Sequence, residues 1–327
     1  MANTDIVRFG VIGSGGITRR FAEGLKDVPN AQLAAVWNHT PEKAQQFAQD
    51  FGTTAVASLE ALLASEIDAV YIGTPHTSHA QYSIAALQAG KAVLSEKPAA
   101  TSLGELEAVL AHAAVHRKLF MEAMKPPFYP LFTKLREALA ADPIGDIQFV
   151  RAGFASPDVP VEHNLYRADM AGGGLLDIGI YGAYLAVSFL GDATNVQTQG
   201  KVVRGVDTFA AVNSQHAKGW SQIYCGLGID GAGDAMLAAP GGHVVIHEKW
   251  WSPQRASIHY KDGRVVELSD DIVGSGLNYE TAHFCDLLRA GKLQSPILSH
   301  DVSRAMIRLL DHARAGLDLV YPFERGL

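Results

Sequence analysis

Lys97 is the residue of this sequence that a purely structural role explains least well. It follows a short apolar segment, residues 92–95, and directly precedes Pro98. A lysine at the end of a buried strand normally extends into solvent. A following proline, however, forces extended or cis backbone geometry, which would aim the ammonium group at a fixed point. We therefore favour a contact with a cofactor or a reacting group, with a solvated lysine as the alternative.

Asp177 and Tyr181 are a second pair of side chains that could orient or move a proton. The glycine-rich residues 172–174 begin a predicted helix that runs to Leu190 and stops at Gly191. Residues four apart share one face of a helix. Both residues also have structural explanations, because the helix dipole favours a carboxylate in the first turn and a buried tyrosine is usually a core residue. The residues alone leave both explanations open.

A glycine-rich loop is the first candidate for cofactor binding. Residues 6–12 predict a buried strand and residues 18–25 a helix, and between them lie Gly13, Gly15, Gly16 and Ile17. Main-chain N–H groups and the positive end of the helix dipole can hold a pyrophosphate there. Thr18 replaces the third small residue of the G-x-G-x-x-G pattern. Similar loops occur in S-adenosylmethionine enzymes and as plain turns, so these alternatives remain.

The residues after the second predicted strand, 32–37, would meet the adenosine ribose of a dinucleotide. A carboxylate there would favour NAD, but the chain has Asn38, His39 and Thr40 and no carboxylate until Glu42. These three side chains could donate hydrogen bonds to a 2′-phosphate, so we expect NADP to be preferred, with NAD as the alternative. Thr40 could equally be the N-cap of a helix that begins at residue 41.

The predicted elements divide the chain into two domains. Strands and helices alternate to residue 124, which predicts an α/β Rossmann domain with a doubly wound parallel sheet. From residue 147 strand follows strand with a single intervening helix. We therefore expect an α+β second domain with an open-faced, mainly antiparallel sheet. The expected domains are residues 1–124, for dinucleotide binding, and residues 125–327, to which the family resemblance given below assigns substrate binding and oligomerisation.

Composition narrows the class of protein. A chain of 327 residues exceeds the length that one core usually serves. A net charge of −7 argues against a nucleic-acid partner, and no apolar run is expected to approach a membrane span. The 13 histidines lack metal-ligand spacing and there are only two cysteines, so we expect no metal. The start of the sequence lacks the features of a signal peptide, which predicts a cytoplasmic protein.

Four motifs give the sequence a specific resemblance. In order along the chain they are Gly13-Ser-Gly-Gly-Ile17, Thr74-Pro-His-Thr-Ser-His79, Ala89-Gly-Lys-Ala-Val93 and Glu96-Lys-Pro98. With this spacing, the sequence resembles the Gfo/Idh/MocA family of nicotinamide-dependent oxidoreductases over essentially its whole length. The resemblance implies cofactor contacts from a wider set of residues, namely Thr74, Pro75, His76, His79, Glu96 and Lys97 in addition to the glycine loop and residues 38–40. For His79, a role at the start of the next helix is an equal alternative.

The resemblance also assigns roles to the possible proton-moving residues. The family's inositol and sugar dehydrogenases carry Asp-x-Gly-x-His where this chain has Asp177-Ile-Gly-Ile-Tyr181. The tyrosine variant is similar to the branch with dimeric dihydrodiol dehydrogenase and NADP-dependent xylose dehydrogenase. It implies that Tyr181 is the acid/base group and that Lys97 and Asp177 assist it. An ammonium group near a tyrosine would lower its pKa from about 10, which suits a base at neutral pH.

The activity implied by the resemblance is hydride transfer between NAD(P) and the CH–OH carbon of a sugar, polyol or trans-dihydrodiol-like substrate. The substrate would contact Lys97, Asp177 and Tyr181. Asn164 and Tyr166, which precede the helix, are further candidates for substrate contact, with an ordinary polar loop as an equal alternative. A non-catalytic NAD(P)-binding regulator of the same fold is the alternative. Lys125 and the prolines after it depart from the branch pattern near the substrate cleft, which leaves the substrate open. Because the second sheet has helices for only one face, we also expect a homo-oligomer, with a dimer as first choice.

Overall fold

The computed structural model describes residues 6–325, and they form two compact units. Of the described residues, unit 1 combines 6–100, 104–125 and 273–300, and unit 2 combines 101–103, 126–272 and 301–325. The main division therefore falls at Lys125, next to the expected boundary. The expected division did not include a return of the chain to the first unit near its C-terminus.

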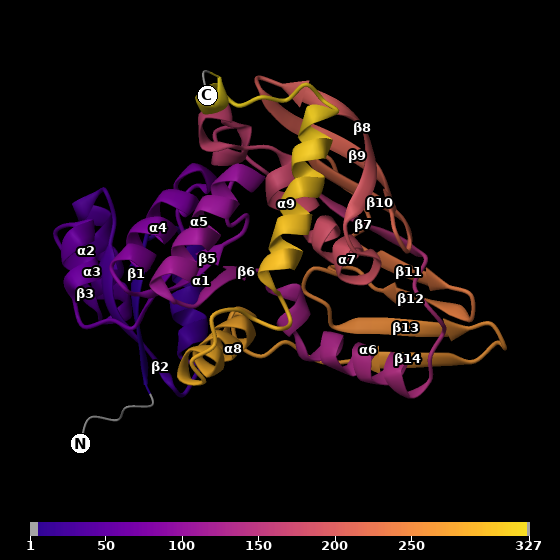
Figure 1. Cartoon of the computed structure of the whole chain (residues 1–327), viewed down its shortest axis with the longest axis horizontal. Coiled ribbons are helices and arrows are strands. Elements are labelled where there is room, and N and C mark those ends of the chain that lie inside the picture. The colour runs from indigo at the N-terminus through magenta and orange to yellow at the C-terminus, as the bar shows by residue number, and fades with distance from the viewer. Residues whose placement is uncertain (1–5, 326–327) are drawn as a thin grey trace. The chain divides into compact units, whose positions relative to one another are not determined.

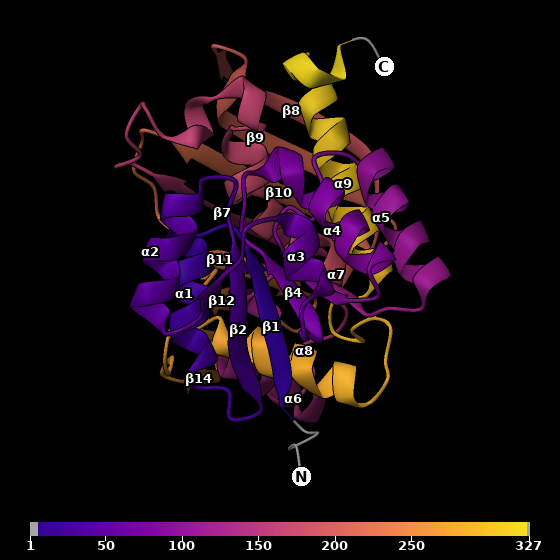
Figure 2. The same ribbon diagram turned by 90° about the vertical axis from the view of Figure 1, so that its left-hand side faces the viewer.

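Unit 1 is built around a parallel sheet with the strand order β3-β2-β1-β4-β5-β6. The strands are β1 (Val7–Ile12), β2 (Ala31–Trp37), β3 (Thr54–Ala55), β4 (Ala69–Ile72), β5 (Ala92–Glu96) and β6 (Phe120–Ala123). The central strands are almost continuous apolar runs, as in sheets covered on both faces. Strands β1 and β2 run side by side in Figure 2. This is the Rossmann-type sheet that the alternation of elements predicts.

Helices connect the strands of unit 1. They are α1 (Gly16–Leu25), α2 (Pro41–Phe51), α3 (Leu59–Ala64), α4 (His79–Gln88) and α5 (Leu103–His116), whose first residue belongs to unit 2. Helix α2 ends at Gly52, which has the left-handed φ of 65° that favours glycine. Helix α3 begins after Ser58, whose hydroxyl accepts a hydrogen bond from the main-chain N–H of Ala61 at 3.1 Å. Turn chemistry and capping therefore account for these helix ends.

A late segment of the chain completes unit 1. Helix α8 (Asn278–Arg289) packs beside α1, and the Phe284 ring lies 5.8 Å from that of Phe9. The guanidinium of Arg20 donates two hydrogen bonds, of 3.0 and 2.6 Å, to the carbonyl of Ser275. Local sequence patterns do not indicate this return, because it depends on contacts across some 250 residues of chain.

Unit 2 is built on a sheet with the order β14-β13-β12-β11-β7-β10-β9-β8. Its strands are β7 (Phe149–Ser156), β8 (Ala193–Val203), β9 (Val206–His216), β10 (Gly219–Leu227), β11 (Ala235–Ala239), β12 (Gly242–Ile246), β13 (Arg255–Tyr260) and β14 (Val265–Ser269). Strands β7 and β10 pair in parallel and the other neighbours are antiparallel. The sheet is mainly antiparallel, which confirms the expected fold class.

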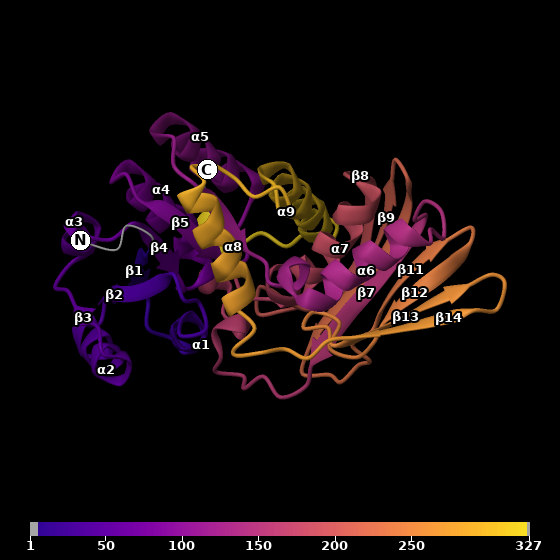
Figure 3. The same cartoon turned by 90° about the horizontal axis from the view of Figure 1, so that it is seen from below.

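Helices of unit 2 lie on one side of this sheet. They are α6 (Pro130–Ala141), α7 (Ile180–Leu190) and α9 (His300–Ala315). Figures 1 and 3 show them on the same side of the strands. Residues on the facing side of the strands, such as Val212, Ile223 and Ile258, are buried against them. The opposite side of the sheet includes Trp220, which is 60% exposed.

One helical stretch of unit 2 is unusually apolar. Residues 168–190 are long and apolar enough to cross a membrane by length and composition, and 83% of the most apolar window is buried inside the structure. The expectation that no apolar run approaches this length is therefore corrected. Its burial against β7 and β10 accounts for the composition, since core helices of globular proteins meet the same test.

Candidate active site

The glycine loop of unit 1 forms an open turn between β1 and α1. Gly13 has a φ of 96°, and a Cβ atom there would lie only 2.5 Å from the carbonyl oxygen of Gly73. Gly15 is the N-cap of α1, and a Cβ atom on Gly15 or Gly16 would have no neighbour within 4 Å. The space next to the first main-chain N–H groups of α1 is therefore open, and the binding of an anionic phosphate requires such space. Ile17 follows in the first turn of the helix.

Thr18, the departure from the glycine pattern, has a clear structural role. Its side chain is fully buried, and its hydroxyl donates a 3.2 Å hydrogen bond to the carbonyl of Gly73 at the end of β4. A Cβ atom on Gly73 would meet that hydroxyl oxygen at 2.3 Å. Thr18 and Gly73 thus fit each other and join the first turn of α1 to the residue after β4.

Residues 38–40 lie directly after β2, next to the glycine loop. The Asn38 amide donates a 2.8 Å hydrogen bond to the hydroxyl of Ser14, and its oxygen accepts one of 2.8 Å from the main-chain N–H of Thr40. His39 is exposed. Thr40 stands at the N-cap of α2, but its side chain makes no capping hydrogen bond. Asn38 therefore supports the loop, while His39 and Thr40 keep polar groups that can face a ribose or its 2′-phosphate.

The loop after β4 is held to the segment after β5 by His79. Thr74 and Pro75 begin this loop and His76 follows. The His79 ring is 1% exposed, with Nδ1 2.7 Å from the carbonyl oxygen of Pro98 and Nε2 2.8 Å from that of Thr74. Main-chain carbonyls thus face both ring nitrogens. This geometry fits the alternative in which His79 serves the start of α4 rather than offering a nitrogen to a cofactor.

Glu96 and Lys97 stand at the carboxyl end of β5. Glu96 is 6% exposed, and its Oε1 accepts a 2.6 Å hydrogen bond from the Tyr71 hydroxyl. Burial raises the pKa of Glu96, and the Tyr71 hydrogen bond and the Lys97 and Lys125 charges oppose that rise. The Lys97–Pro98 peptide bond is cis. Glu96 therefore belongs to the interior of unit 1, and Lys97 is half-buried just beyond the carboxyl end of β5.

The structure also places the charged side chains of Arg20, Lys125 and Glu280 close enough to one another to interact electrostatically, and Lys125 and Glu280 also interact with Glu96. Glu280 of α8 is 1% exposed, and burial, then the charge of Glu96, raise its pKa well above the ordinary value. Burial lowers the pKa of Lys125 to about 8, and the Arg20 and Lys97 charges act in the same direction. Arg20 could not have been singled out from its sequence context. Glu280 could not either, because its burial depends on the return of residues 273–300 to unit 1.

In unit 2, Asp177 and Tyr181 follow a glycine-rich turn. Asp177 lies in a π-helical stretch, Leu175–Gly179, which continues directly into α7. Such wide turns inside helices are frequent at functional sites. Tyr181 is 8% exposed, and its ring lies 5.8 Å from that of Phe154, which in turn stacks on Trp251 at 3.6 Å. The helix begins and ends at the glycines that the sequence indicates.

The expected substrate residues of the preceding loop differ in exposure. Asn164 and Tyr166 lie in the single turn Asn164–Tyr166, in which Asn164 is exposed and Tyr166 half-buried. The neighbouring Arg167 is paired with Asp169 by hydrogen bonds of 3.1 and 2.5 Å. Among residues 6–325, no group of three or more histidine, cysteine, aspartate or glutamate side chains could hold a metal ion.

Comparisons with known proteins match most of this chain. The family model described as an oxidoreductase family with an NAD-binding Rossmann fold matches residues 7–124, and that of the GFO/IDH/MocA C-terminal domain matches residues 132–266. The chain is 29% identical to an NADP⁺-dependent scyllo-inositol 2-dehydrogenase of Bacillus subtilis, over 98% of this chain and 100% of that protein. It is 30% identical to a trans-1,2-dihydrobenzene-1,2-diol dehydrogenase of Xenopus laevis, over 96% and 99%.

A solved structure is similar over nearly the same length. It is a 3-ketoreductase from Actinomadura kijaniata in complex with NADP and TDP-benzene, with 26% sequence identity and a TM-score of 0.83. The match covers 95% of this chain and 98% of that one.

Proposed function

Since this chain belongs to the Gfo/Idh/MocA family of oxidoreductases, we propose that it transfers a hydride between a nicotinamide cofactor and the CH–OH carbon of a sugar, polyol or trans-dihydrodiol-like substrate. The relatives named as an inositol dehydrogenase, a dihydrodiol dehydrogenase and a 3-ketoreductase support this range of substrates.

The observation that carries the cofactor assignment is the open start of α1. Gly15 and Gly16 leave space at the first N–H groups of the helix, and Gly13 allows β1 and β4 to approach closely beneath them. A cofactor pyrophosphate fits a loop of this kind. The bound nicotinamide would supply the hydride acceptor. The residues contribute binding at residues 13–17, ribose contacts at His39 and Thr40, and the lysine at the end of β5.

We assign the proton transfer to Tyr181. A carbinol carbon releases hydride only as its hydroxyl proton is lost, so a base must stand at that hydroxyl. An ordinary tyrosine has a pKa near 10, too high for an efficient base at neutral pH. In this proposal the Lys97 ammonium stabilises the Tyr181 phenolate, and Asp177 orients the substrate or the lysine. Acid–base assistance of this kind contributes roughly 10²–10⁴-fold to the rate.

NADP is the proposed cofactor. His39 and Thr40 bring no negative charge to the ribose site, and the hydrogen bonds of Asn38 with Ser14 and Thr40 hold the end of β2 next to the glycine loop. The names of the Bacillus relative and of the solved ketoreductase complex both include NADP, which supports the same choice.

We also propose a cytoplasmic location and a dimer. Cys225 and Cys285 are both free and buried, which suits a reducing compartment. The dimer proposal rests on the side of the unit 2 sheet that includes Trp220 and is tested below.

Tyr181→Phe tests the proton-transfer role. The substitution removes the hydroxyl and keeps the ring against Phe154, so NADPH affinity and melting temperature should change little while turnover falls roughly 10²-fold or more. The assay begins with a panel of aldoses, inositols and trans-dihydrodiols with NADP⁺. Tyr184→Phe is the matched control, because Tyr184 lies three residues further along the same helix and is also buried. Equal turnover in the two variants would show that Tyr181 is only a core residue.

A further inference from the structure

The C-terminal segment of the chain reaches the start of the helix that carries Asp177 and Tyr181. Tyr321 is fully buried, and its hydroxyl donates a 2.7 Å hydrogen bond to the carbonyl of Gly172, 149 residues earlier. Gly172 precedes Asp177 by five residues. This contact lies inside unit 2 and has no part in the proton-transfer assignment above.

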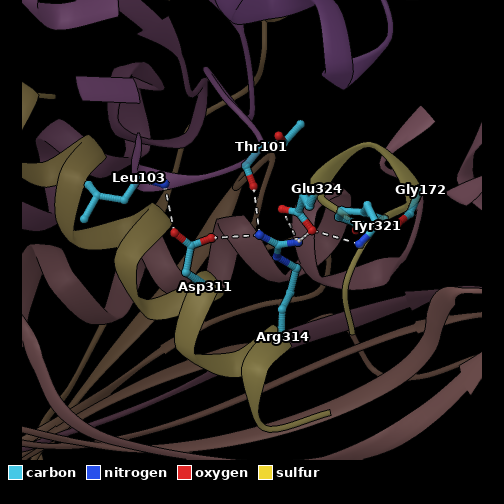
Figure 4. Close-up of polar contacts among 7 residues, drawn as sticks. All are labelled: Thr101, Leu103, Gly172, Asp311, Arg314, Tyr321 and Glu324. Carbon is cyan, nitrogen blue, oxygen red and sulfur yellow. Dashed lines mark hydrogen bonds and ion pairs between the residues drawn. The ribbon is translucent and has the colours of Figure 1, made fainter. Parts of the chain in front are cut away.

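Arg314 of α9 joins Tyr321 to a second segment. Its side chain is 7% exposed, and its guanidinium lies 4.9 Å from the centre of the Tyr321 ring. Nη2 donates to the carbonyl of Thr101 at 3.2 Å and Nη1 donates to both carboxylate oxygens of Glu324 at 3.0 Å. Figure 4 shows Arg314 between these groups. Thr101 follows Lys97 by four residues, so this contact fixes the chain shortly after the lysine.

Two acidic residues complete the network around Arg314. Asp311 accepts from Nη2 of Arg314 at 3.1 Å and from the main-chain N–H of Leu103 at 2.8 Å. Glu324 also accepts a 2.8 Å hydrogen bond from the main-chain N–H of Tyr321. One buried cation thus faces two carboxylates, and each carboxylate also holds a main-chain group. The geometry fixes main-chain positions rather than merely filling space.

The turn that receives the Tyr321 hydrogen bond has little room to move in other directions. A Cβ atom on Gly172 would lie 2.6 Å from the carbonyl oxygen of Leu165, and one on Gly173, whose φ is 119°, would lie 2.1 Å from a carboxylate oxygen of Asp207. Asp207 also accepts a 2.7 Å hydrogen bond from the main-chain N–H of Leu175. The Tyr321 hydroxyl adds a long-range hydrogen bond to this turn.

We propose that Arg314 and Tyr321 are positioning residues that hold, in one network, the segment following Lys97 and the turn preceding Asp177 and Tyr181. This rests on the proposed function, because it matters for catalysis only if Lys97 and Tyr181 act together. Small displacements of catalytic groups reduce rates strongly, on the order of 10²-fold for 1 Å. The network therefore acts on turnover more than on cofactor binding.

Tyr321→Phe and Tyr260→Phe form a matched pair for the first test. Each loses one hydroxyl that donates to a main-chain carbonyl, to Gly172 in the first and to Asp142 at 3.0 Å in the second. Tyr321→Phe should lower kcat about tenfold and leave the KM for NADPH within about twofold, whereas Tyr260→Phe should leave both unchanged. Equal kcat values in the two variants would overturn the proposal.

Arg314→Lys and Arg308→Lys extend the test along α9. Arg308 pairs with Asp192 at 2.8 Å at a more exposed position and is the control. A lysine cannot reproduce the forked contacts to Thr101 and Glu324, so Arg314→Lys should lower kcat while Arg308→Lys does not. A kcat loss in Arg308→Lys of the same size would contradict the assignment.

Hydrogen–deuterium exchange separates this proposal from the proposed function. In Tyr321→Phe, exchange should rise in the peptide covering residues 172–182 and stay unchanged in Tyr260→Phe, whether or not a substrate is known. Unchanged exchange in that peptide would refute the network. If exchange rises in that peptide of Tyr321→Phe but the Tyr181→Phe enzyme remains active, the network is supported and Tyr181 is not the acid/base group.

Discussion

Lys97 stands at the carboxyl end of β5 beside the buried carboxyl group of Glu96. Burial raises the pKa of Glu96, and the hydrogen bond from Tyr71 and the charges of Lys97 and Lys125 lower it. Several charged groups therefore share one end of the sheet in unit 1. The role of a single charge in this group can be tested by removing it and by making the same substitution elsewhere in unit 1.

Lys97→Met is expected to lower turnover and to move the pH–rate profile of the remaining activity to higher pH. The physical reason is that a phenolate at Tyr181 would lose its stabilising ammonium, so its pKa would return towards 10. Lys118→Met is the control, since Lys118 is also half-buried but precedes β6, at the amino end of the parallel strands, whereas Lys97 lies at the carboxyl end. An unshifted profile in Lys97→Met would remove the lysine from the proton-transfer step.

His39→Asp should move cofactor preference from NADPH towards NADH. A carboxylate at this exposed position would repel a 2′-phosphate and accept hydrogen bonds from a ribose hydroxyl. A change of roughly tenfold in the ratio of the two dissociation constants corresponds to about 1.4 kcal/mol. Fluorescence titration with both cofactors measures it, with His116→Asp on α5 as the control. If the ratio does not move, the ribose lies elsewhere.

At the scale of elements, the start of the helix containing Asp177 depends on Asp207 of β9. This side chain is fully buried, and its carboxylate receives the Leu175 N–H. Burial raises the pKa of Asp207 to about 7, and main-chain hydrogen bonds and the Arg314 charge oppose the rise. Burial, and then the charge of Asp207, raise the pKa values of the neighbouring Tyr321 and Cys225. The fold thus favours the neutral form of this acid more than water does.

Asp207→Asn should change how stability depends on pH. Because the folded-state pKa is raised, the stabilising contribution of the neutral acid is complete below about pH 4 and is lost as pH rises through about 7. The free energy of unfolding of the wild type, relative to Asp207→Asn, should therefore fall between about pH 4 and 7, by at most about 1.4 kcal/mol per pH unit. Urea unfolding at several pH values measures it. Parallel curves for the two proteins would contradict the raised pKa.

At the scale of the whole molecule, the sheet of unit 2 has helices on one side only. The other side carries Trp220, which is 60% exposed, and the stacked pair His243 and His259. An extended sheet face with large exposed apolar side chains is typical of an interaction surface. A second copy of the chain is the partner that we propose.

Light scattering at micromolar concentration should therefore give the mass of a dimer. Trp220→Glu should produce monomers, because it places a charge in the interface, while Val115→Glu should not. Val115 is the matched control, since it is 76% exposed on a helix of unit 1. A wild-type protein that is monomeric under these conditions would refute the dimer.

Local sequence patterns by themselves determined much of the fold. Strand β1, the glycine turn and α1 follow from an apolar run, three glycines and an amphipathic segment, all within about twenty residues. The helix with Asp177 and Tyr181 was predicted in the same way, from the glycines at its two ends. Hydrophobic periodicity and turn residues specify elements of this kind because the interactions involved are short-range. The family resemblance rests on motifs that are equally local.

Only the tertiary structure decided what those elements contact. The return of α8 to unit 1, the burial of Asp207 and the Tyr321–Gly172 hydrogen bond each join residues far apart in the chain. His79 is a further case, because its two carbonyl partners come from different loops. No periodicity marks such pairs: a residue's burial and partners depend on which segments pack together. The sequence and its family resemblance therefore predicted the candidate catalytic residues, and the folded chain showed the long-range contacts of the segments next to them.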